Sequence, residues 1–303
     1  MFGQCPTNMW VTSRPMGRQL KELIALILLG VGSFSATAQT ITAVRLGKLW
    51  DGDCVIDRAV VVIEPGRIRS VQGGNPEPAA GAKVIDWSRY YAIPGMIDVH
   101  THMTYVLDTS RISEAGRGAA TVYLSQDNAK KTLETGVTTV RNLNAACYED
   151  IAMRDLINAG LMVGPRMYVS GYGLHIRGGR GGPSAADGVA EVMKVVRAQI
   201  AVGAGVVKVY GSTGSGQDVT GFQTFTYEEL KAAVDTGHAL GKTIATHTYG
   251  PAGDRDAVRA GADSIEHAND MEDETISEMA RKKIFYFPTI DQTRYYVDDA
   301  KLL

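Results

Sequence analysis

From Ala92 onward, short apolar runs alternate with amphipathic stretches, and this rhythm constrains the fold more than any other feature of the sequence. Seven runs have the length and composition of buried strands: 96–100, 137–141, 167–170, 206–210, 243–247, 263–267 and 284–288. Between them lie helical patterns, such as 120–135, 149–159, 190–202 and 227–240. The last follows Thr226, with Glu229 three residues on, which is the capping-box arrangement. Strands that alternate with helices predict an α/β fold built on a parallel sheet.

Seven such units in succession favour a TIM-type (β/α)8 barrel over an open doubly wound sheet. No glycine-rich dinucleotide fingerprint follows an early strand, and we interpret the glycine-rich stretch 178–183 as a loop near the active site. A complete barrel takes about 250 residues, whereas residues 92–303 number 212. We therefore expect an incomplete barrel of about seven strands that lacks the last one.

Residues 39–91 differ from the rest of the chain. Short β-type runs at 41–46, 59–63, 68–71 and 83–86 are separated by turn signals such as Asp51-Gly52 and Pro65-Gly66. This pattern predicts a small N-terminal β domain.

Residues 1–38 have the features of a Sec signal peptide. Three basic residues precede the apolar run 23–34, and Ala36-x-Ala38 follows it as a cleavage site before Gln39. The run is shorter than the roughly 20 residues of a spanning helix, so a membrane anchor is the weaker alternative; Met16 is an alternative start. We expect a periplasmic or secreted protein that is free of the membrane after cleavage.

The bulk composition excludes some functions. A net charge of −2 argues against nucleic-acid binding, which needs a basic face. Cleavage of the leader would leave Cys54 and Cys147. The sequence cannot establish whether they pair, and we expect two separate buried thiols rather than a disulfide scaffold.

Four of the six histidines fall at the ends of predicted strands: His100, His102, His247 and His267. Functional residues of a TIM barrel lie at the carboxyl ends of its strands, and imidazole nitrogens suit zinc and similar ions. Two histidines at i and i+2 of a strand also project to one side. The sequence therefore predicts a metal site.

Lys208 lies in the apolar run 206–210, where a buried ammonium is costly. Two interpretations stay open on the residue pattern. Lys208 pairs with an acid or reaches solvent, or its amine has a lowered pKa and reacts with carbon dioxide to give an anionic, bridging carbamate ligand. Of the remaining histidines, we expect His238 to pack between helix and barrel. His175, in the loop after the third strand, either has a structural role or contacts substrate.

Several motifs resemble the amidohydrolase superfamily in order: PGMIDVHTH, GVTTVRNL, VVKVYGSTG, ATHTYG, AVRAGADSIEHA and FYFPTI. The likeness runs from about residue 41 to 303 and points to the imidazolonepropionase-related members, which include Xaa-Pro dipeptidases and ochratoxinase-type amidases. It implies His100 and His102 on one metal and His247 and His267 on a second. It also implies carboxylated Lys208 as the bridging catalytic ligand, zinc as the metal, and residues 39–91 as part of a β-sandwich.

The resemblance implies hydrolysis of amide or peptide C–N bonds in small substrates, such as Xaa-Pro dipeptides or N-acyl amino acids. Tyr210 either helps hold the substrate or is structural. Arg180 stands where relatives commonly carry histidine, and it either binds a substrate carboxylate or is a solvated loop residue. The family's strand-eight aspartate has no counterpart, and Asp291 is not its equivalent. The alternative is a truncated, non-catalytic chain that binds metal. A homo-oligomer is compatible with either.

Overall fold

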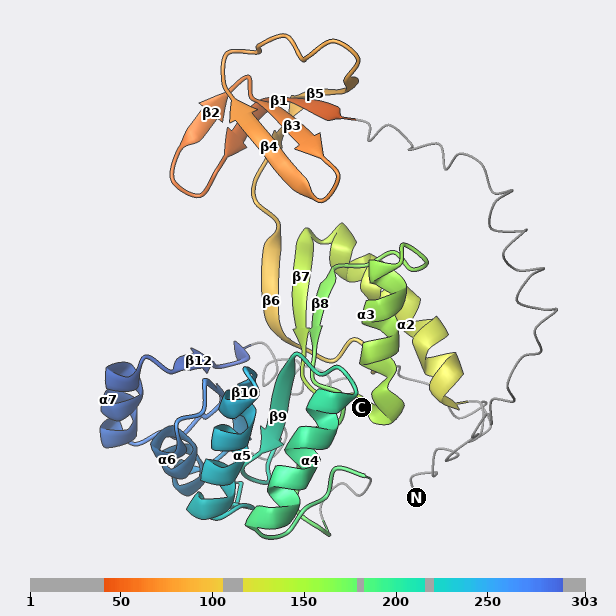
Figure 1. Ribbon diagram of the computed structural model, residues 1–303. Coiled ribbons are helices and arrows are strands. Elements are labelled where there is room, and N and C mark those ends of the chain that lie inside the picture. Colours follow the sequence, from red (N-terminus) through yellow and green to blue (C-terminus); the bar gives the residue numbers. More distant parts are fainter. Residues whose placement is uncertain (1–40, 106–116, 179–182, 216–220, 291–303) are drawn as a thin grey trace, which may run out of the picture. The chain divides into compact units, whose positions relative to one another are not determined.

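In the computed structural model, residues 41–105, 117–178, 183–215 and 221–290 are described. They form two compact units that divide between Pro94 and Gly95. Figure 1 labels the elements of both units. The expected leader (residues 1–38), Arg180 and Asp291 lie outside the described residues.

The N-terminal unit is a single five-stranded sheet. Its strands are β1 (Thr42–Trp50), β2 (Val55–Asp57), β3 (Val60–Glu64), β4 (Arg67–Gln72) and β5 (Lys83–Ala92). The order β2-β1-β3-β4 is antiparallel, and β5 pairs with β1 in parallel. Alternate residues of β1 and β3, including Val44, Leu46 and Val61, form the small core. The predicted β domain is present, although within the described residues it has one layer rather than the two of a sandwich.

The larger unit has the predicted α/β alternation. Its elements are β6 (Met96–Thr101), α2 (Arg117–Glu134), β7 (Val137–Asn142), the 3₁₀ turn η2 (Ala146–Tyr148), α3 (Glu149–Asn158), β8 (Arg166–Val169), α4 (Val189–Ala201), β9 (Val206–Tyr210), α5 (Tyr227–Ala239), β10 (Thr243–Thr248), α6 (Pro251–Ala260), β11 (Ser264–His267), α7 (Asp273–Lys282) and β12 (Phe285–Phe287). No helix in the described ranges is both long and apolar enough to cross a membrane.

The seven strands of this unit form two parallel sheets, β6-β7-β8 and β12-β11-β10-β9. Helices α2 and α3 pack on the first sheet, and α4, α5 and α6 pack on the second (Figure 1). The loop after β8 joins the sheets, because the backbone of Leu174 donates to the Lys208 carbonyl and accepts from the Tyr210 amide, each at 2.8 Å. In the described part of the chain β6 and β12 do not pair, so the barrel is not closed between them.

Local sequence accounts for the elements that position the site. The capping box of α5 is formed as predicted, since Thr226 accepts from the Glu229 amide and Glu229 accepts from the Thr226 amide. Strands β9, β10 and β11 of the second sheet are buried on both faces, as in β9, where all five residues are buried, whereas the edge strand β12 is mostly exposed. This burial explains why the predicted strands were continuous apolar runs.

The prediction that both cysteines are buried is wrong. Cys54 is exposed and Cys147 is half-buried. Cys54 lies in the turn between β1 and β2, and turn residues stay at the surface because their backbone polar groups need water.

Candidate active site

Four strands of the larger unit bring the predicted site residues together. His100 lies on β6 with His102 just after it, Lys208 lies at the centre of β9, and His247 and His267 lie near or at the carboxyl ends of β10 and β11. Carboxyl ends of parallel strands meet at one end of the unit. This arrangement places one side-chain cluster where barrel enzymes carry their chemistry.

The four imidazole rings form a continuous row, which we call the histidine cluster. Ring centroids are 5.5 Å apart for His100 and His102, 4.8 Å for His100 and His267, and 4.6 Å for His247 and His267. All four residues are buried or half-buried. The sequence prediction that histidines 100, 102, 247 and 267 converge is therefore met by the geometry.

Tyrosine rings enclose the histidine cluster. Tyr105 stacks on His102 with ring centroids 4.4 Å apart, and Tyr249 stacks on His267 at 4.9 Å. Tyr210 lies 5.0 Å from the His247 ring. Tyr210 and Tyr249 are buried and exclude water beside His247 and His267, which strengthens electrostatic interactions there, whereas Tyr105 is half exposed.

Lys208 is buried beside the histidine cluster. Its side chain is 1% exposed, and its Nζ lies 5.4 Å from the centroid of the Tyr210 ring. Burial, and then the charge of Lys208, holds the pKa of His100 well below its usual range and lowers that of His267 to about 2. Both rings are therefore neutral at physiological pH, and the neutral form is the one that binds metal ions.

Left-handed backbone conformations occur at the strand ends around the site. His267 and Ala268 have φ angles of 74° and 43°, Thr289 has 48°, and Asn144, after β7, has 104°. Such conformations are costly for residues other than glycine and collect at functional sites. The Tyr286 hydroxyl holds the strained pair by donating to the His267 carbonyl at 2.9 Å.

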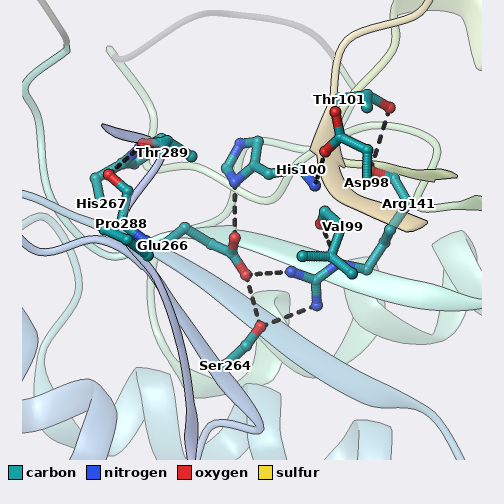
Figure 2. A network of polar contacts seen from close by, with 10 residues as sticks. All are labelled: Asp98, Val99, His100, Thr101, Arg141, Ser264, Glu266, His267, Pro288 and Thr289. Carbon is teal, nitrogen blue, oxygen red and sulfur yellow. Dashed lines mark hydrogen bonds and ion pairs between the residues drawn. The ribbon is translucent and has the colours of Figure 1, made fainter. Parts of the chain in front are cut away.

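A second polar network lies behind the histidines and was missed from the sequence. Figure 2 shows the Glu266 carboxylate between His100 and Arg141. His100 Nδ1 lies 2.7 Å from Glu266 Oε2, while Arg141 Nη2 and the Ser264 hydroxyl donate to Oε1, each at 2.6 Å. Arg141 Nε also donates to the Val99 carbonyl at 2.6 Å. One signal could have found this network: a glutamate and an arginine each occur inside an apolar strand run, and buried charges need partners.

His267 is oriented from a different side. Its Nδ1 lies 2.6 Å from the Thr289 hydroxyl, also drawn in Figure 2. The Nδ1 atoms of His100 and His267 are thus both occupied by protein groups. Metal-binding histidines commonly have this arrangement, because a partner on one ring nitrogen orients the other.

The donor types fit a divalent cation of the zinc class, since four imidazoles and a lysine amine share one site. As the side chains lie, no three His, Cys, Asp or Glu residues of the described chain are arranged around a common ion position. The imidazoles pack ring against ring instead. We therefore propose metal binding from the chemistry of the imidazole and amine donors and from the orientation of the His100 and His267 rings.

Of the predicted substrate contacts that the structure describes, one lies at the histidine cluster and the other does not. Tyr210 joins the histidine cluster through His247. His175 is buried in its own loop, where its Nδ1 donates to the Ile176 carbonyl at 3.0 Å. The expected packing of His238 between helix and barrel is wrong, because the side chain is exposed and its Nε2 hydrogen-bonds the Asp263 carboxylate at 2.8 Å.

A cavity of about 640 Å³ lies elsewhere, at the amino ends of β10, β11 and β12. It is lined by the first residue of each of these strands and reaches Arg141. Active sites of barrel enzymes lie at the opposite ends of the strands. The histidine cluster, not this cavity, is therefore the candidate active site.

Comparisons with known proteins give a family and several relatives. Residues 91–302 match the Amidohydrolase family. The ochratoxinase of Aspergillus niger is 31% identical over 232 residues, which cover 65% of this chain and 47% of that protein. The chain thus spans about half the length of the curated relatives it matches.

Solved structures superpose on a larger share of the chain. A Xaa-Pro dipeptidase with methionine bound in its active site has a TM-score of 0.75 at 27% identity, over 86% of this chain and 70% of the dipeptidase. A prolidase complexed with N-methylphosphonate-L-proline has a TM-score of 0.71 at 26% identity, over 82% of this chain and 66% of the prolidase.

Proposed function

Because the chain belongs to the amidohydrolase family, we propose that it acts as a metal-dependent hydrolase of amide or peptide C–N bonds. The proposed substrates are small molecules such as Xaa-Pro dipeptides or N-acyl amino acids. The observation that carries the proposal is the convergence of four histidines beside a buried lysine at the strand ends. The dipeptidase and prolidase among the solved structures, with ochratoxinase among the curated relatives, support this bond type.

Two pairs of residues would hold the metal: His100 with His102, and His247 with His267. Lys208 would bridge them as a carbamate. Its neutral amine attacks the carbon of carbon dioxide, an N–C bond forms, one N–H proton leaves to water, and an anionic oxygen ligand results. When bound, divalent cations such as zinc supply Lewis acidity that lowers the pKa of water and polarises a carbonyl group.

The chain's own residues would orient the substrate and exclude water. Tyr210 lies beside His247 and Lys208, where a phenol can donate to a substrate oxygen. Tyr105 and Tyr249 wall the site by stacking on histidine rings. His175 remains a proposed contact for the substrate, and Arg180 remains a proposed partner of the substrate carboxylate.

One experiment separates the proposed hydrolase from the alternative of a non-catalytic metal-binding chain. That alternative is favoured by the missing pairing of β6 with β12 in the described residues. The purified chain is analysed for bound metal and then assayed on Xaa-Pro dipeptides and N-acyl amino acids, with Lys208→Ala as the inactive control. If the wild-type protein contains bound metal and hydrolyses one of these substrates, and Lys208→Ala abolishes that hydrolysis, the hydrolase is supported. Bound metal without hydrolysis supports the non-catalytic alternative. Folded protein with neither bound metal nor hydrolysis refutes both.

Export to the periplasm or medium is a separate proposal that rests on residues 1–38. Expression of the full chain in a bacterial host, followed by mass determination, tests it. A mature protein that begins at Gln39 is the expected result, and an uncleaved chain in the cytoplasm would contradict it. Size-exclusion chromatography with light scattering would decide whether the mature chain is a homo-oligomer.

A further inference from the structure

The Glu266 carboxylate joins the two sheets of the larger unit. It is 0% exposed and lies on β11, next to His267. Its Oε2 faces His100, and its Oε1 receives hydrogen bonds from Arg141 and Ser264 (Figure 2). His100 and Arg141 belong to β6 and β7, whereas Glu266 and Ser264 belong to β11. One buried carboxylate therefore links the ring of His100 to the opposite sheet.

The chemistry of this contact determines where His100 carries its proton. Glu266 is paired with the Arg141 guanidinium at 2.6 Å, and an ionised carboxylate only accepts hydrogen bonds. Nδ1 of His100, 2.7 Å away, must then be the donor. A neutral imidazole protonated at Nδ1 carries its lone pair at Nε2.

We propose that Glu266 is a positioning residue that fixes His100 as the Nδ1–H tautomer, and that the resulting Nε2 lone pair is what His100 offers to a divalent cation. The cation part rests on the proposed function, whereas the tautomer part stands on the contacts alone. Carboxylate partners of this kind raise the basicity of a metal-binding histidine and orient its ring.

Arg141 and Ser264 make the oxygens of Glu266 unequal. Ser264 Oγ accepts from Arg141 Nη1 at 3.0 Å, so its own proton points to Glu266 Oε1. Arg141 and Ser264 thus both donate to Oε1, so the atom at that position must be an acceptor. Oε2 is the oxygen that contacts His100.

This asymmetry makes Glu266→Gln a specific test. The amide oxygen of glutamine has to occupy the Oε1 position, because Arg141 and Ser264 both donate to it. The amide NH₂ group then faces His100 and donates to Nδ1, which moves the ring proton to Nε2. The side chain keeps its size while the tautomer of His100 is inverted.

The experiment measures the tautomer without metal. ¹⁵N-histidine NMR of the metal-free protein distinguishes Nδ1–H from Nε2–H rings, and His100→Gln assigns the His100 signals by their loss. We expect Nδ1–H in the wild type and Nε2–H in Glu266→Gln. Zinc affinity, measured by competition with a chromophoric chelator, should weaken about 10- to 100-fold in Glu266→Gln.

Ser264→Ala is the matched control. It removes one donor to Oε1 from the same strand and keeps Arg141, so His100 should stay Nδ1–H and the zinc affinity should stay near that of the wild type. A merely structural role of the network would weaken binding in both variants without inverting the tautomer.

Wild-type His100 protonated at Nε2 overturns the inference, whether or not any variant folds. Glu266→Gln that keeps Nδ1–H, or that inverts the tautomer and binds zinc as tightly as the wild type, also overturns it. A chain that binds no zinc but shows the expected pair of tautomers refutes the proposed function and supports the positioning of His100 by Glu266.

Discussion

Replacing Glu149 by glutamine should stabilise the protein above neutral pH and not below pH 4.5. Glu149 is the first residue of α3, is 6% exposed and lies beside buried Asp150. Burial, and then the charge of Asp150, raises the pKa of Glu149 from 4.5 to about 7, although a hydrogen bond with Thr121 opposes the rise. Glutamine resembles the protonated acid in shape and carries no charge.

The sign and size of this effect follow from proton linkage. The folded pKa lies above the unfolded value, so the stability contributed by protonated Glu149 is complete below about pH 4.5 and is lost as the pH rises through about 7. A shift from 4.5 to about 7 corresponds to at most about 3 kcal/mol at 1.36 kcal/mol per pH unit. Glu149→Gln should therefore be about 1–3 kcal/mol more stable than the wild type at pH 8 and equal to it at pH 4.

Urea unfolding at pH 4, 6 and 8 measures this difference. Glu228 provides the control, because it is also a first-turn glutamate, on α5, but is exposed. Glu228→Gln should be neutral or slightly destabilising at pH 8, since it removes a favourable charge at a helix amino end. The reasoning is refuted if Glu149→Gln gains nothing at pH 8, or if its gain is the same at pH 4.

Three further predictions concern the cap, the strained turn and the metal. Thr226→Ala should cost about 1 kcal/mol in urea unfolding through loss of the α5 cap; a cost near zero would contradict the capping box. Tyr286→Phe should cost about 1 kcal/mol by removing the donor to the His267 carbonyl, and an unchanged midpoint would show that the hydroxyl does not hold the turn. Under the proposed function, a chelator should lower the melting temperature, because zinc at 100 times its Kd stabilises by about 2.7 kcal/mol; equal melting curves with and without chelator would argue against a bound metal.

Much of the larger unit followed from periodicity. The predicted helix 149–159 compares with the observed Glu149–Asn158, and the predicted strand 206–210 is β9. Both were predictable because strands buried on two faces are continuous apolar runs, whereas amphipathic helices repeat every 3.6 residues. The histidine cluster followed from the same logic, since parallel strands bring their carboxyl ends together.

The remaining features depend on tertiary contacts that no local pattern specifies. Glu266 meets Arg141 only because β11 and β7, which belong to different sheets, come together in the folded unit. The left-handed φ of His267 is set by its neighbours, among them Tyr286, and not by its own preference. Strand β2 has only three residues, which is too short to be recognised as an apolar run in the sequence. Its partner β1 extends to Trp50 because β2 pairs with it.

The metal content of the purified chain tests the central claim most directly. Wild-type protein and Lys208→Met are equilibrated with zinc, freed of excess metal, and analysed by mass spectrometry for zinc per folded chain. Methionine fills a buried lysine site without charge and cannot form a carbamate, so the fold should persist. We expect up to two zinc ions on the wild type and a clear loss in Lys208→Met. A folded wild-type chain without zinc, or a variant that retains the full amount, would contradict the assignment of this site.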